Sequence, residues 1–248
     1  MVEGFVACHA GAMNTVALAK RPAIDERSQV RRALGTDIPK LAAVLARAFD
    51  ADPFINWCVL QDSRRAERFT VTFDLILRRI SKDLNETFTT TSLDGCAIWK
   101  RPSEHALRFG EQLSLLPAFA RVMGWPALPR FSRFLECAQR LHERLAPLPH
   151  YYLFMLGVDP AAQRRGIGSQ LLEPVLARCD EEQKVAYLET ARAENVPYYA
   201  RHGFQVAHVL DEVRFPKLWL MLRLPNAPRE RVAQDSLAGH HRVVASCR

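Results

Sequence analysis

The segment from Tyr151 to Phe204 constrains the fold more than any other part of the chain. An apolar run of strand length, residues 151–158, leads into a turn at 159–162. Residues 163–168, QRRGIG, then open a helix with an apolar period. The first backbone N–H groups of a helix have no internal partners, and the helix dipole places partial positive charge there. A strand, a glycine-containing turn and a helix N-terminus in this order predict a binding site for a pyrophosphate.

The residues of the turn exclude two common classes of phosphate-binding motif. The turn is not a P-loop, because no Gly-Lys-Ser/Thr follows it. The dinucleotide fingerprint fits poorly as well, since Leu171 occupies its third glycine position. Gly166 and Gly168 would let the backbone approach phosphate oxygens, and Arg164 and Arg165 add positive charge beside them.

The turn and the segment after it together resemble the GNAT superfamily of N-acetyltransferases. Residues 163–168 match the motif Q/R-x-x-G-x-G/A, and Asn195, Tyr199 and Gly203-Phe204 match N-x-x-x-Y-x-x-x-G-F. Within the superfamily the chain is most similar to the puromycin N-acetyltransferase group. Three stretches carry this similarity: DGCAIWKRP, LGVDPAAQRRGIGSQLL and LETARAENVPYYARHGF.

The resemblance implies an α/β fold of the mixed α+β kind, with a central mixed, mostly antiparallel sheet flanked by helices. We expect a flexible N-terminal extension at 1–27, a GNAT domain at 28–225 and a disordered C-terminal tail at 226–248. The local patterns predict strands at 29–34, 87–91, 96–100, 151–158, 185–189, 204–210 and 218–224. They predict helices at 37–49 with Asp37 as the cap, from Asp62 onward, at 103–146 with proline interruptions, at 166–182 and at 196–202.

The resemblance also implies that the chain binds acetyl-CoA as a cosubstrate, without a metal. The pyrophosphate would lie on the turn, whose residues are Gln163, Arg164, Arg165, Gly166, Ile167, Gly168 and Ser169. The pantetheine arm would pair with the strand at Leu156, Gly157 and Val158 like an added strand, and Gly157 would permit unusual dihedral angles there. Asn195 and Tyr199, four residues apart on one helix face, would contact pantetheine and sulfur, with Asn195 also capping the helix.

The family chemistry needs an acid for the departing thiolate and a base for the amine. Tyr199 is the predicted acid. Strand 151–158 contains no carboxylate, so the predicted base is Glu189, with His150 and Tyr152 as alternatives. Glu189 could equally bind the ammonium group or serve only the structure.

The acceptor pocket is expected between the end of helix 37–49, the helical insert and the last strands. This region is rich in aromatic residues, which suits either an apolar amine or an ordinary core. They are Trp57, Phe109, Phe119, Trp125, Phe131 and Phe134.

Composition excludes several other classes. The chain has 248 residues, 48% of them hydrophobic and 25% charged, which suits one globular domain. No run approaches a membrane span, and no secretory signal is evident at the start. The six cysteines form no C-x-x-C pair, which argues against zinc and favours a reduced cytoplasm. The net charge of +7 is spread over helices, so no nucleic-acid partner is expected.

The sequence thus predicts a cytoplasmic N-acetyltransferase that moves an acetyl group from acetyl-CoA to the primary amine of a small molecule, puromycin-like or another. Two alternatives stay open: acetylation of a protein or peptide, and a CoA-binding module without catalysis. The missing carboxylate on strand 151–158 keeps the second alternative open.

Overall fold

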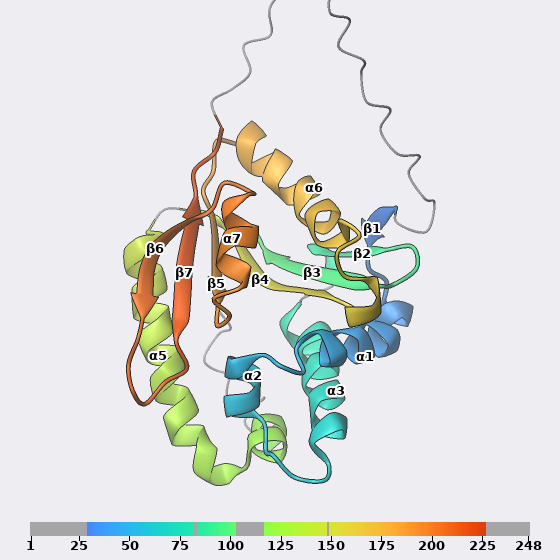
Figure 1. The fold of residues 1–248 in the computed structure, drawn as a ribbon, viewed down its shortest axis with the longest axis vertical. Helices are drawn as coiled ribbons and strands as arrows, with labels where there is room; N and C mark the ends of the chain where they lie inside the picture. The colour runs from blue at the N-terminus through green and yellow to red at the C-terminus, as the bar shows by residue number, and fades with distance from the viewer. Residues whose placement is uncertain (1–28, 82–83, 103–116, 148, 227–248) are drawn as a thin grey trace, which may run out of the picture.

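A mixed seven-stranded sheet organises the molecule (Figure 1). The computed structural model describes residues 29–81, 84–102, 117–147 and 149–226. The strand order is β1-β2-β3-β4-β5-β7-β6, and among the described residues only the β4–β5 pair is parallel. The expected mostly antiparallel α/β fold is therefore confirmed. The strands are β1 (Val30–Arg32), β2 (Thr87–Thr90), β3 (Gly95–Lys100), β4 (Tyr151–Val158), β5 (Ala186–Thr190), β6 (Gln205–Leu210) and β7 (Leu218–Arg223).

Helices cover both faces of the sheet. On one face, α6 (Ile167–Glu181) and α7 (Asn195–Ala200) pack on β3, β4 and β5. On the other, α1 (Ile38–Ala48) and α3 (Arg65–Leu75) pack on β3 and β4, while α5 (Leu128–Leu145) packs on β5, β6 and β7. The short α2 (Pro53–Cys58) lies between these two groups, since Phe54 packs against both.

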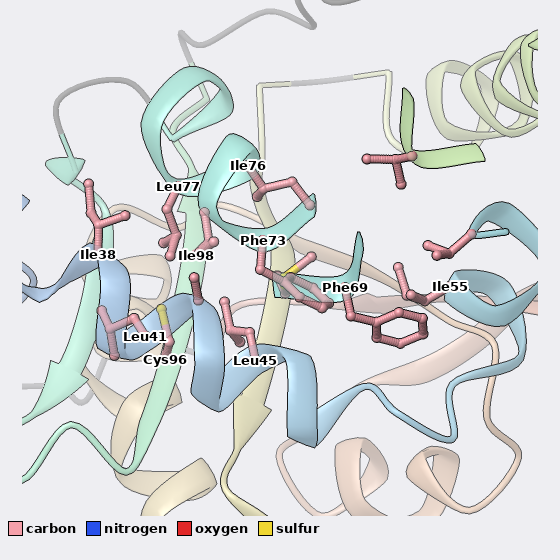
Figure 2. Packing of buried hydrophobic residues seen from close by; sticks show 14 of the residues in the cluster. Ile38, Leu41, Leu45, Ile55, Phe69, Phe73, Ile76, Leu77, Cys96 and Ile98 are labelled. Carbon is pink, nitrogen blue, oxygen red and sulfur yellow. The ribbon is translucent and has the colours of Figure 1, made fainter. Parts of the chain in front are cut away.

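The core under α1 shows why these helices form. Apolar residues recur at helical spacing in α1, and Leu41 and Leu45 are completely buried. Figure 2 shows them facing Phe73 of α3 and Ile98 of β3, which are also fully buried. Burying side chains of this size contributes roughly 1.5–3 kcal/mol each, so this cluster fixes α1 firmly against the sheet.

Two local expectations need correction, and one helix was not predicted. That helix is α2, in which Asp52 is the cap and Pro53 takes the first position. The expected helix from Asp62 changes into a π-helical turn, η3 (Ile76–Ile80), directly after α3. Asp37 does not cap α1 with its side chain, because its carboxylate accepts from Leu34 N and pairs with Arg31.

Several expectations lie outside the described residues. The flexible extension at 1–27, Phe109 within the insert and nearly all of the tail at 226–248 belong to this group. The first tail residue, Asn226, is described. It donates from its backbone and its side chain to Asp180, at 2.8 and 2.9 Å.

Candidate functional site

Strands β4 and β5 separate halfway along their length. They pair only from Tyr151 to Leu153 of β4, whereas β3 pairs along all of β4. Phe154 has no partner in the β3 register, because Ile98 opposes Met155 and Trp99 opposes Leu153. This is a β-bulge, which bends a strand and increases its twist. Beyond it, residues 154–158 of β4 have no strand partner on the β5 side within the described part of the chain.

The glycine turn begins where this free edge ends. Arg164 and Gly166 both take left-handed backbone conformations, with φ values of 63° and 81°, and α6 begins at the next residue. The Gln163 side chain donates to Val158 O at 3.1 Å, which ties the turn to the strand end. Arg47 of α1 pairs with Asp159, whose carboxylate accepts from Ala161 N. These contacts fix the turn against β4 and α1, so the N-terminus of α6 is held in a defined position.

The three glycines of this region serve different purposes. Gly166 has a left-handed φ and open space where a side chain would stand. A Cβ on Gly168 would come within 2.6 Å of the Tyr198 hydroxyl oxygen. Gly157 does not adopt the unusual dihedral angles expected for it. A Cβ there would lie 2.6 Å from Leu45 Cδ2, so glycine is required by the close approach of α1.

Helix α7 places Tyr199 in the core cluster that also holds Leu153 of β4 and Leu188 of β5, the last paired residues before the two strands separate. Tyr199 is only 7% exposed and packs near Phe204, with ring centroids 6.0 Å apart. Burial, then the charges of Tyr198 and Asp52, raise the pKa of its hydroxyl. Tyr199 therefore holds its proton at neutral pH and can act as a donor.

Asn195 differs from expectation, and Tyr198, on the same helix, is a packed aromatic residue. Asn195 is the first residue of α7 and does not cap it with its side chain; its amide donates to Thr190 Oγ1 at 3.2 Å. Tyr198 lies against α6, where its buried hydroxyl makes no hydrogen bond within the described residues. Burial raises the pKa of Tyr198, and the nearby Ser169 hydroxyl opposes this. Ser169 lies 3.0 Å from His202 Nε2, so the first turn of α6 and the end of α7 are joined.

Glu189 lies on the opposite face of the sheet from α6 and α7. Tyr187 donates to one of its oxygens at 2.6 Å and Tyr152 to the other at 3.3 Å. Burial raises the pKa of Glu189, and the two tyrosine donors partly oppose it. A carboxylate has about four acceptor positions, so two hydrogen bonds leave room for a third partner. Tyr187, two residues before Glu189 on the same face of β5, was not predicted from sequence, whereas Tyr152 is brought to this face by the pairing of β4 with β5.

His142 of α5 extends this polar cluster. Its ring stacks on Tyr187 with centroids 4.1 Å apart, and its Nε2 lies 2.7 Å from His150 Nε2. Burial, then the charge of His150, lower the pKa of His142 to about 4. His150, the alternative base predicted from sequence, therefore has its Nε2 directed at His142.

We expect acid to destabilise the protein through His142. Because its folded pKa is depressed, its contribution is fully present above the ordinary histidine pKa of about 6.5 and is lost as pH falls toward about 4. After allowance for partial exposure, the loss should be on the order of 2 kcal/mol. Urea unfolding across this range should show a shallower loss for His142→Gln than for wild type. Equal slopes would contradict the assignment.

Aromatic side chains gather between α2, α5 and the β6–β7 loop. Phe54 lies 4.8 Å from Phe134 and Phe134 lies 5.5 Å from Phe215, measured between ring centroids. The predicted Trp57, Phe119 and Phe131 join this cluster. Phe54 and Phe215 were missed, and Trp125 is 69% exposed and points away from the core. The rings contact one another closely, as in a packed core.

Neither a metal-binding cluster nor a membrane-spanning helix is found among the described residues. Within the described ranges, no group of His, Cys, Asp or Glu side chains could hold a metal ion. In the same part of the chain, no helix is long and apolar enough to cross a membrane.

Comparison with known proteins agrees with the fold. Residues 133–206 match the acetyltransferase (GNAT) domain family. An uncharacterized N-acetyltransferase of Schizosaccharomyces pombe is 32% identical over 101 residues, which span 39% of this chain and 41% of that protein. The chain thus aligns with less than half of that relative.

Solved structures show the same fold. The histone acetyltransferase and related acetyltransferase of Corynebacterium glutamicum superposes with a TM-score of 0.60 at 21% identity, covering 81% of this chain and 98% of that one. Arylalkylamine N-acetyltransferase 2 of Aedes aegypti gives 0.55 at 12% identity, covering 80% and 99%. The chain therefore shares the fold of these solved structures, and its residues 133–206 match the family model of the acetyltransferase (GNAT) domain.

Proposed function

We propose that this protein is an acetyl-CoA-dependent N-acetyltransferase that acts on the primary amine of a small molecule. One observation carries the proposal: the free edge of β4 runs directly into a glycine turn at the N-terminus of α6. A free strand edge can pair with the amide-bearing pantetheine arm, and a helix N-terminus can hold a pyrophosphate. GNAT-fold enzymes use acetyl-CoA, which carries both groups.

The residues present fit this ligand. Residues 156–158 offer backbone groups on the free edge, and the turn from Gln163 to Ser169 offers N–H groups and two arginines. The buried, unbonded Tyr198 hydroxyl lies beside this turn. An open groove of about 630 Å³, lined in part by Ser169, Arg201 and His202, continues from it and has room for the nucleotide end.

The proposed chemistry divides between the two faces of the sheet. A free N–H on β4 polarises the acetyl carbonyl as its oxygen gains charge. The amine nitrogen bonds to the carbonyl carbon, the carbon–sulfur bond breaks, and Glu189 accepts the proton that leaves the nitrogen. Tyr199 donates a proton to the departing thiolate, and both groups return to their starting states by exchange with solvent.

Glu189 gives this scheme a characteristic pH dependence. Because burial raises its pKa, kcat/KM should fall with decreasing pH at values above the ordinary glutamate range, which lies near 4.3. Glu189→Gln should remove this acid-side fall of the pH profile and lower kcat/KM by about 10²–10⁴-fold. Glu136→Gln, on the exposed side of α5, is the matched control and should leave the profile unchanged. An unaltered profile in Glu189→Gln would remove this residue from the role of base.

The acceptor and the subgroup are the finer parts of the proposal. The similarity to the puromycin N-acetyltransferase group rests on the three sequence stretches quoted above. Structural neighbours are named for both a histone and an arylalkylamine acceptor, so they support an amine without choosing its kind. The aromatic cluster beside Glu189 favours a small apolar amine over a peptide. The cytoplasmic location and the absence of nucleic-acid partners stay predictions.

A thiol-release assay tests the proposal. Wild type would be incubated with acetyl-CoA and single amines: puromycin, 2-phenylethylamine, putrescine and a peptide with a free N-terminus. We expect thiol release above the acceptor-free rate with at least one small amine. Release with the peptide alone would support the protein-acetylating alternative, and binding of acetyl-CoA without any release would support a non-catalytic module.

A further inference from the structure

Asp52 is a buried carboxylate with one unused oxygen. It is 7% exposed and precedes α2. Its Oδ1 accepts from the backbone N–H groups of Phe54 and Ile55, both at 3.0 Å. Its Oδ2 accepts no hydrogen bond from any described residue. The capping function therefore occupies only half of the carboxylate.

A buried carboxylate with one oxygen that accepts no hydrogen bond is stabilised by a cation. Burial of a charge is costly unless it is paired, and two backbone N–H bonds leave the negative charge itself without a counterion. Arg192 is near enough for its charge to act on Asp52, but its own ion-pair contact is with Glu194 at 3.6 Å. Oδ2 also keeps some solvent-accessible surface, since it is not one of the fully enclosed polar atoms without a partner among the described residues.

The surroundings of Asp52 connect it to the free edge of β4. Its backbone N–H donates to Phe49 O at 2.9 Å, and the Phe49 ring lies against Gly157 on that edge. The charge of Asp52 also contributes to the raised pKa of Tyr199. Phe54, two residues further on, packs against Phe134 and Trp57 of the aromatic cluster, so Asp52 lies near both the free edge and this cluster.

We propose that Asp52 binds the acceptor amine in its protonated form, with the free Oδ2 receiving N–H hydrogen bonds from the ammonium group. The ammonium group releases one proton to solvent before the neutral nitrogen attacks, and its second proton passes to Glu189. This assignment rests on the proposed function and specifies its substrate class. The acceptor is an alkyl primary amine that is cationic at neutral pH and carries an apolar body. Weakly basic aromatic amines, which are neutral there, would gain nothing from Asp52.

The substitution Asp52→Asn tests this without removing the cap. Asparagine caps helices about as well as aspartate, so α2 should persist while the charge is lost. Loss of a charge-assisted hydrogen bond should raise the KM for 2-phenylethylamine, or for the small amine that wild type acetylates fastest, by about 10–100-fold. The KM for acetyl-CoA should stay within about twofold of wild type. Asp52→Glu, which restores the charge, should recover part of the loss.

Asp37→Asn is the matched control, because Asp37 is also 7% exposed and lies at the start of a helix, but pairs with Arg31. It should alter stability and leave both KM values unchanged. An unchanged amine KM in Asp52→Asn, or an equal rise in both KM values, would overturn the assignment while the proposed function stands. If wild type acetylates no amine of the panel, the proposed function fails and the assignment fails with it.

Discussion

Gly166→Asp should abolish measurable acetyl-CoA binding while the chain stays folded. The substitution introduces a carboxylate at the residue that precedes α6, where nothing lies within 4 Å of the new Cβ. A negative charge there opposes both the helix dipole and a bound phosphate. Two unit charges about 4 Å apart at an effective dielectric constant near 20 repel by about 4 kcal/mol, which corresponds to roughly a thousandfold loss of affinity.

The control for this variant is Gly166→Asn. Both side chains must adopt the left-handed φ of 81°, which costs on the order of 1 kcal/mol, but asparagine carries no charge. Titration calorimetry should therefore show a modest loss for Asn and a severe loss for Asp, with similar melting temperatures. Equal affinities in wild type and Gly166→Asp would show that α6 does not hold the phosphates. Gly168→Asp should abolish binding as well, but it is a weaker test because its Cβ also meets the Tyr198 hydroxyl.

Tyr199→Phe should lower kcat by about 10²-fold, near the lower end of the usual range for general acids. The hydroxyl is proposed to act only as the thiolate departs, so the affinity for acetyl-CoA should barely change. The ring stays in place and keeps its packing against Phe204, so stability should be nearly unaffected.

Tyr198→Phe separates this role from simple packing. Tyr198 is adjacent in sequence and half-buried, but its hydroxyl lies against Gly168 on α6. Its loss should therefore change turnover much less than the loss of the Tyr199 hydroxyl. If both variants keep full turnover with a good acceptor, Tyr199 is a packing residue and the thiolate leaves by another route.

Local sequence patterns were sufficient to predict the strands and helices of the site, but they did not predict the separation of β4 from β5. The apolar run, the glycine pair and the periodic helix predicted β4, the turn after it and α6 within a residue or two, because each pattern reflects local backbone physics. The separation of β4 from β5 depends on the bulge at Phe154, and a bulge is defined by the register of a partner strand far away in sequence.

Asp52 shows the same limit at a single residue. Its sequence signal, aspartate followed by proline, is a good helix start, yet six residues are too short for a helical period to be recognised. Its proposed role depends on its burial and on the packing of Phe54 against the aromatic cluster, and both come from tertiary contacts. Gly157 is similar, because the side chains of α1 that exclude a Cβ come from a segment about a hundred residues earlier.

The central claim is that the free edge of β4 and the N-terminus of α6 form a metal-independent site for acetyl-CoA. Titration calorimetry of the full chain with acetyl-CoA and with CoA, each in the presence and absence of EDTA, tests it most directly. The account predicts saturable binding of both ligands, unchanged by the chelator and weakened by added salt because phosphate charges contribute to it. No binding, or binding that is lost when EDTA is added, would contradict the account.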